Sequence, residues 1–166
     1  MDDIQKRLKE TLAAARRVTV LGVGSPLRSD DGAGMLVIEK LLESLPSCPQ
    51  LLLCGGETAP ENFTGKIKAF QPDLLIVVDA CDVGLAPGAV VEIPPEKVGG
   101  PSFCSHMLPV KVMISYLVEE TGTSAILLGF QYKTLLFDGP MSPEMEGAVD
   151  SFCGMLQGLI RDKWNL

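Results

Sequence analysis

The sequence has few of the features that mark membrane, secreted or nucleic-acid-binding proteins. Only 5% of its 166 residues are aromatic, histidine occurs once, and 14 Lys and Arg face 21 Asp and Glu. The net charge of −7 argues against general nucleic-acid binding, which depends on basic side chains that neutralise phosphates. No apolar run approaches the roughly 20 residues that span a bilayer, and the acidic start Met1–Asp3 is unlike a secretory signal. We therefore expect a cytoplasmic protein with no membrane insertion and no nucleic-acid partner.

The cysteines form no pattern typical of a disulfide framework or a zinc knuckle. Their number is odd, and no two of them make a Cys-x-x-Cys pair. We therefore predict reduced thiols in a reducing compartment. The residues concerned are Cys48, Cys54, Cys81, Cys104 and Cys153.

Apolar, β-branched runs alternate along the chain with segments whose apolar residues recur every three or four positions. This alternation predicts parallel strands joined by crossover helices. The fold class is then α/β, a three-layer α/β/α sandwich with a mostly parallel five-stranded sheet, whose short edge strand is open to an antiparallel orientation. We expect strands at 18–23, 51–54, 74–79, 89–93 and 125–130, and helices at 33–45, 60–70, 109–120 and 142–160.

The chain shows no repeat, low-complexity tract or change of composition that would divide it. We therefore expect a single domain over residues 1–166, with 1–17 as an amphipathic helix added to the core fold. In the helix at 109–120, the apolar residues Val112, Ile114, Leu117 and Val118 are expected to face inward.

Three polar features lie where an α/β fold binds ligands, beyond the carboxyl ends of its strands. Asp30 and Asp31 follow the first strand, Asp79 ends the most continuous apolar run, and His106 lies in an irregular segment. Two carboxylates and one imidazole would suit a divalent cation and leave positions open for water or substrate.

Each of these residues also has a purely structural interpretation. Asp30 and Asp31 could cap the helix that follows them. Asp79 could form a turn by bonding its own downstream backbone, and a single loop histidine is often a surface residue. The spacing of these residues alone therefore leaves the metal-site hypothesis open.

Other kinds of site find less support. A dinucleotide fingerprint starting at Gly22 would need glycine at Leu27, and acidic residues at the helix start would repel a pyrophosphate. No Gly-x-Ser-x-Gly nucleophile elbow is present. Cys104 precedes His106 by two residues, so an extended chain would place both side chains on one face, and a Cys–His nucleophile remains an alternative.

Four motifs, in this order, resemble those of the nickel–iron hydrogenase maturation endopeptidases. LGVGSPLRSDDGAG at 21–34 resembles the first motif of that family, LIVVDA at 75–80 the second, and SHMLP at 105–109 the third. GGETAPEN at 55–62 is similar to the branch that serves formate-hydrogenlyase-type hydrogenases. Ser25 departs from the asparagine that many members have there. The resemblance extends from about Val18 to the last helix.

The resemblance implies an endopeptidase that removes the C-terminal extension from the precursor of a hydrogenase large subunit after nickel insertion. It implies that Asp31, Asp79 and His106 are both the metal ligands and the catalytic residues, and that the divalent metal is nickel presented by the substrate. Asp30 and Glu57 are candidates for supporting groups around them. The alternative with the same ligands is a non-catalytic metal-binding or chaperone module for hydrogenase assembly.

Overall fold

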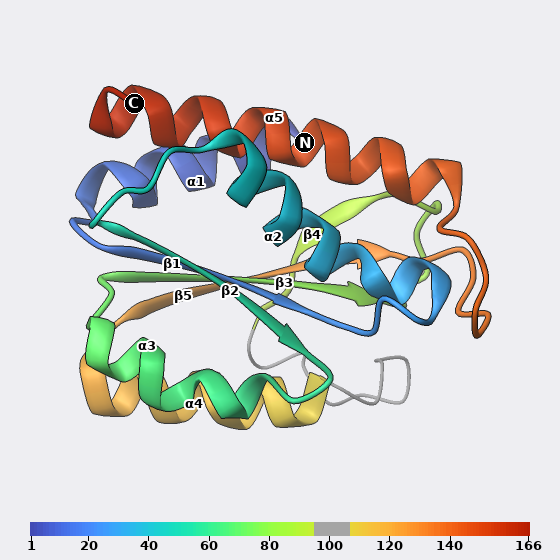
Figure 1. Cartoon of the computed structure of the whole chain (residues 1–166), viewed down its shortest axis with the longest axis horizontal. Coiled ribbons are helices and arrows are strands. Elements are labelled where there is room, and N and C mark those ends of the chain that lie inside the picture. The colour runs from blue at the N-terminus through green and yellow to red at the C-terminus, as the bar shows by residue number, and fades with distance from the viewer. Residues whose placement is uncertain (95–106) are drawn as a thin grey trace.

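The computed structural model describes residues 1–94 and 107–166, and in these ranges five strands form one sheet between two layers of helices (Figure 1). The sheet order is β2-β1-β3-β5-β4, with β4 antiparallel to β5 and every other pair parallel. The predicted three-layer, mostly parallel α/β fold is therefore confirmed. The strands are β1 (Val18–Val23), β2 (Leu51–Glu57), β3 (Leu74–Cys81), β4 (Val90–Glu92) and β5 (Ser124–Gln131).

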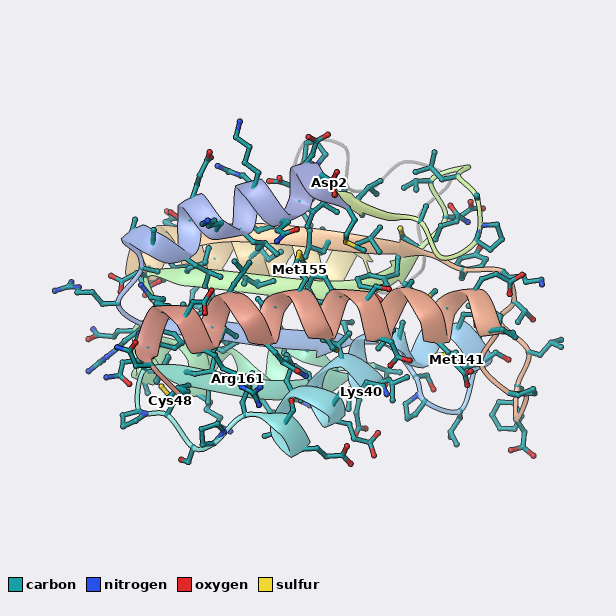
Figure 2. All side chains as sticks on the ribbon, turned by 90° about the horizontal axis from the view of Figure 1, so that it is seen from above. Asp2, Lys40, Cys48, Met141, Met155 and Arg161 are labelled. Carbon is teal, nitrogen blue, oxygen red and sulfur yellow. The ribbon has the colours of Figure 1, made fainter. Side chains whose placement is uncertain are left out.

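The helices divide between the two faces of the sheet. Three of them cover one face, where α1 and α2 lie on either side of α5 (Figure 2). Among the residues that the structure describes, none of the helices is both long and apolar enough to cross a membrane. The covering helices are α1 (Asp2–Ala14), α2 (Ala33–Ser44) and α5 (Pro143–Trp164) on one face, and α3 (Thr64–Phe70) and α4 (Met107–Thr121) on the other.

The alternation of side chains along β3 determines which layer each residue faces. Leu74, Ile76 and Val78 pack in the core beneath α1, α2 and α5, whereas Leu75 and Val77 pack in the core beneath α3 and α4. The whole strand is buried. By the same alternation, Asp79 shares the face of Val77, which is the face that α4 covers.

Two glycines allow α2 to begin directly on the sheet. A Cβ atom at Gly34 would lie 2.3 Å from the Val23 carbonyl oxygen and 2.5 Å from that of Val78. A Cβ atom at Gly22 would lie 2.0 Å from the Gly34 carbonyl oxygen. No side chain fits between helix and sheet here, so the short 3₁₀ turn before α2, η1 (Ser29–Gly32), lies at the carboxyl edge of the strands.

The carboxyl edge also receives the start of α4. In a crossover connection between parallel strands, the helix runs opposite to the strands and so begins where they end. Figure 1 shows this arrangement: the yellow beginning of α4 lies on the side toward which the arrow of β3 points. The turn before α2, the end of β3 and the start of α4 therefore lie at one edge of the sheet.

Candidate active site

The loop between β1 and α2 wraps around Asp31. Gly24 has a φ of 119°, and a Cβ atom there would lie 1.8 Å from the Asp31 carbonyl oxygen, so the position requires glycine. The Ser25 backbone N–H donates a 3.0 Å hydrogen bond to Asp31 Oδ2. The Asp31 residue is only 2% exposed. The loop thus holds this carboxylate beneath the surface at the carboxyl edge of the sheet.

Asp79 is a fully buried carboxyl group near the end of β3. Among the described residues, neither of its side-chain oxygens has a hydrogen-bond partner. Burial raises the pKa of Asp79 well above its usual value, and the nearby charge of Asp31 raises it further. The Ala80 backbone N–H acts in the opposite direction, but it makes no hydrogen bond of normal geometry with either oxygen. Asp31 and Asp79 are therefore neighbours across the ends of β1 and β3.

The unpaired oxygens of Asp79 fit a bound cation. A buried carboxylate without a partner is unfavourable, and a second carboxylate beside it increases the penalty, whereas a divalent cation would compensate both charges. Among residues 1–94 and 107–166, no group of three His, Cys, Asp or Glu side chains is arranged to hold a metal ion. The predicted third ligand, His106, lies outside the described residues, as does Cys104. The sequence places His106 directly before α4, whose first residue is Met107.

Asp30 has a different environment from its neighbour Asp31. Its carboxylate accepts hydrogen bonds from the backbone N–H groups of Lys133 (2.8 Å), Thr134 (3.2 Å) and Ser142 (2.7 Å), and from Ser142 Oγ (2.9 Å). It therefore ties the segment between β5 and α5 to η1. The sequence does not predict these contacts, because Asp30 and Ser142 are 112 residues apart.

The structure shows that two of the structural interpretations are wrong. The N-cap residue of α2 is Gly32, and no side chain caps this helix, so Asp30 and Asp31 do not serve as its caps. Asp79 does not close a turn, because β3 continues to Cys81 and pairs there with β5. Glu57, a candidate supporting group, is exposed, and its carbonyl oxygen accepts a 2.9 Å hydrogen bond from Gly24 N–H.

The cysteines agree with the prediction of reduced thiols as far as they are described. Cys48, Cys54, Cys81 and Cys153 are all buried, and none of these four forms a disulfide. Burial raises the pKa of Cys153 to about 12, which makes a thiolate there unfavourable. Cys81 packs in the core beneath α4, where a Cβ atom on Gly129 would lie 2.4 Å from its sulfur.

A family model, a related sequence and a solved structure all indicate the same family. The family model HycI, described as hydrogenase maturation protease, matches residues 35–158. The hydrogenase 3 maturation protease of Escherichia coli K12 is 34% identical over 140 residues, which are 84% of this chain and 88% of that protein. The crystal structure of the [NiFe] hydrogenase maturation protease HycI from Thermococcus kodakarensis KOD1 matches with a TM-score of 0.85 and 30% identity, over 93% of this chain and 99% of that one.

A solved structure of an E. coli protein adds the type of activity. The solution structure of the endopeptidase HycI matches with a TM-score of 0.75 and 32% identity, over 86% of this chain and 90% of that one. Fold and site thus define an α/β enzyme with a carboxylate centre at the carboxyl edge of its sheet. The chain belongs to the HycI family of hydrogenase maturation proteases, and the endopeptidase activity that its motifs predict is confirmed.

Proposed function

We propose that this endopeptidase removes the C-terminal extension from the precursor of a nickel–iron hydrogenase large subunit after nickel insertion. The observation that carries this proposal is the carboxyl group of Asp79, which is fully buried beside Asp31 and has no hydrogen-bond partner in the part of the chain that the structure describes. Similarity to a hydrogenase 3 maturation protease supports the branch that the motif at 55–62 indicates.

In this proposal, Asp31, Asp79 and His106 hold a divalent metal at the carboxyl edge of the sheet. A metal bound there would polarise the scissile carbonyl or lower the pKa of a water molecule. Two observations support this assignment: Asp31 accepts a hydrogen bond from the Ser25 N–H, and neither oxygen of Asp79 has a hydrogen-bond partner among the described residues. One of these carboxylates then takes the proton of the attacking water.

The metal that these residues bind is the nickel carried by the precursor and so is part of the substrate. The three side chains provide only part of the coordination sphere of a nickel ion. A precursor without nickel offers no metal for them to bind. Cleavage therefore occurs only after nickel has been delivered to the precursor, because the enzyme recognises the precursor through its nickel.

The test is incubation of the purified chain with a nickel-loaded precursor, with shortening of the precursor measured by mass spectrometry. We expect the wild type to cut it and to leave a nickel-free precursor intact. Asp79→Asn and His106→Ala should fold, as measured by circular dichroism, and leave the loaded precursor uncut. Asp162→Asn, at an exposed position on α5, is the matched control and should cut normally.

Two results would count against the proposal. Full processing by Asp79→Asn or His106→Ala would show that the residue concerned is not required. Stable co-elution of the wild type with a loaded precursor that is never shortened would instead indicate a binding module for hydrogenase assembly.

A further inference from the structure

Three large apolar side chains are exposed on two loops at the edge of the sheet where Asp31 and Asp79 lie. Leu27, between β1 and α2, is 60% exposed; Leu136 and Phe137, between β5 and α5, are 66% and 76% exposed. We call these three side chains the apolar tip. Clustered apolar exposure of this kind is typical of interaction sites, because large side chains in water gain free energy when a partner covers them.

The two loops of the apolar tip are bonded to each other. The Asp138 N–H donates a 2.8 Å hydrogen bond to the Leu27 carbonyl oxygen, and Ser29 Oγ donates a 2.9 Å hydrogen bond to that of Leu136. In Figure 1 the orange segment between β5 and α5 lies beside η1. Figure 2 labels Met141, where this segment enters α5; its Cε would lie 3.7 Å from a Cβ atom on Gly32.

Asp30 fastens both ends of the segment that carries Leu136 and Phe137. Its buried carboxylate accepts four hydrogen bonds from Lys133, Thr134 and Ser142, which lie on both sides of Leu136 and Phe137. Displacement of either end of the segment that carries Leu136 and Phe137 would therefore break charge-assisted hydrogen bonds. A surface ordered in advance loses little conformational entropy when it binds a partner.

The apolar tip lies close to the carboxylate site along the chain. Leu27 and Asp31 belong to one loop and are four positions apart, so their Cα atoms are at most about 14 Å from each other. An extended polypeptide covers that distance with four or five residues. A chain whose scissile bond reaches Asp31 and Asp79 therefore has residues within reach of the tip.

We propose that the apolar tip docks an apolar segment of the precursor polypeptide within about five residues of the bond that is cut. This inference rests on the proposed function, because it names the part of that substrate that the tip binds. The precursor is favoured over a second copy of the chain as occupant. A second copy seated on the tip would cover the approach to Asp31 and Asp79, which a peptidase must keep open.

The experiment compares the wild type with the double variant Leu136→Ser/Phe137→Ser on a nickel-loaded large-subunit precursor over a range of concentrations. We expect KM to rise at least tenfold and kcat to stay within twofold, because the tip binds substrate and does not touch the reacting atoms. Leu42→Ser is the matched control: Leu42 is 61% exposed but lies on α2, and its replacement should leave KM unchanged. Thermal unfolding should show similar Tm values for all three proteins.

The outcomes separate this inference from the proposed function. Normal cleavage by the wild type with an unchanged KM in the double variant overturns docking and leaves the proposed function intact. If the wild type does not cut the precursor, the proposed function fails, and calorimetric titration of the precursor then decides about docking: equal affinities for wild type and double variant overturn it. A wild-type dimer that dissociates in the double variant, with KM unchanged, would assign the tip to self-association and also overturn docking.

Discussion

Asp30 and Asp31 are adjacent and chemically identical, yet their surroundings give them different tasks. Four hydrogen bonds satisfy the Asp30 carboxylate, so it positions the backbone of two loops. Asp31 is held by the Ser25 N–H and lies close enough to Asp79 to raise the pKa of that carboxyl. The difference between the two aspartates therefore depends on residues that are distant in sequence, Ser142 for Asp30 and Asp79 for Asp31, as well as on the nearby Ser25.

Asp79→Asn is expected to stabilise the metal-free protein at neutral pH by about 1–2 kcal/mol, because it removes a buried carboxyl group that is unfavourable in its ionised form. Burial and the charge of Asp31 raise the folded-state pKa of Asp79 above its ordinary value of 3.8. The unfavourable contribution of the Asp79 carboxyl to the stability of the wild type is therefore absent below pH 3.8 and grows as the pH rises toward the folded-state pKa. Urea unfolding of both proteins with a chelator, at pH 7 and at about pH 3.5, measures the stability difference between Asp79→Asn and the wild type. This difference should be smaller at the lower pH.

A conservative exposed substitution provides the control for that comparison. Asp162→Asn keeps the same chemistry at an exposed position and should leave stability at pH 7 nearly unchanged. If Asp79→Asn were less stable than the wild type at pH 7, the Asp79 carboxylate would have to be paired in the folded protein.

The site was only partly predictable at this scale. The rule that ligands bind at the carboxyl ends of strands placed Asp31 and Asp79 at one edge, and the structure brings them together. The sequence alone could not exclude a turn at Asp79. The turn is excluded by the pairing of Asp79 with Gly129, which lies 50 residues away in another strand. The role of His106 stays a prediction.

Among the elements, the bounds of β1 agree fully with the sequence, whereas the inward face of α4 was wrong in part. Ile114 and Leu117 are buried as expected, but Val112 is 63% and Val118 40% exposed. Positions two apart on a helix lie about 200° apart around its axis, so Val112 and Ile114 cannot both face the sheet. The apolar residues of α4 are too numerous for apolarity alone to identify the buried stripe.

The end of β2 was also misplaced, for a reason that lies in another element. Gly55 and Gly56 suggest a strand end in the sequence, yet β2 continues through them to Glu57. A Cβ atom on Gly55 would lie 2.6 Å from the Met35 Cε, so glycine here makes room for a side chain of α2. This requirement becomes visible only once helix and strand are packed.

Gly34→Ala is expected to destabilise the protein by at least about 2 kcal/mol, because the atoms that the new Cβ meets are backbone oxygens of Val23 and Val78. The clash of the new Cβ with these oxygens could be relieved only if α2 shifted as a unit and moved η1 with it. Because η1 carries Asp31, precursor cleavage should fall as well. Gly158→Ala in α5 is the matched control: nothing lies within 4 Å of its Cβ, and it should stabilise the helix by about 0.5–1 kcal/mol. Urea midpoints measure both, and a wild-type midpoint for Gly34→Ala would contradict the close helix–sheet contact.

In the whole molecule, aspartates lie at both edges of the sheet, and their pairing differs from one aspartate to the next. At the carboxyl edge, Asp79 has no hydrogen-bond partner within residues 1–94 and 107–166, whereas at the amino edge Asp73 connects the starts of three strands. Asp73 Oδ2 accepts 2.8 Å hydrogen bonds from the N–H groups of Arg16 and Arg17, and the Asp73 carbonyl oxygen accepts one of 2.9 Å from Ser124 N–H. Asp73 at the amino edge and Asp30 at the carboxyl edge thus connect separate segments, whereas Asp79, which we propose as a metal ligand, has no hydrogen-bond partner among the described residues.

Asp73→Asn is therefore expected to flatten the acid side of the stability curve. The N–H groups of Arg17 and Arg16 lower the pKa of Asp73 below its ordinary value of 3.8. A lowered folded-state pKa means that the stabilisation is present above the ordinary value and is lost as pH falls through the folded-state pKa. The wild type should exceed the variant by about 0.5–1 kcal/mol at pH 7, a small value because solvent screens this half-exposed group, and by almost nothing near about pH 2. Urea midpoints between these pH values test this: Asp162→Asn should keep the acid slope of the wild type, and parallel curves for wild type and Asp73→Asn would contradict the role of Asp73.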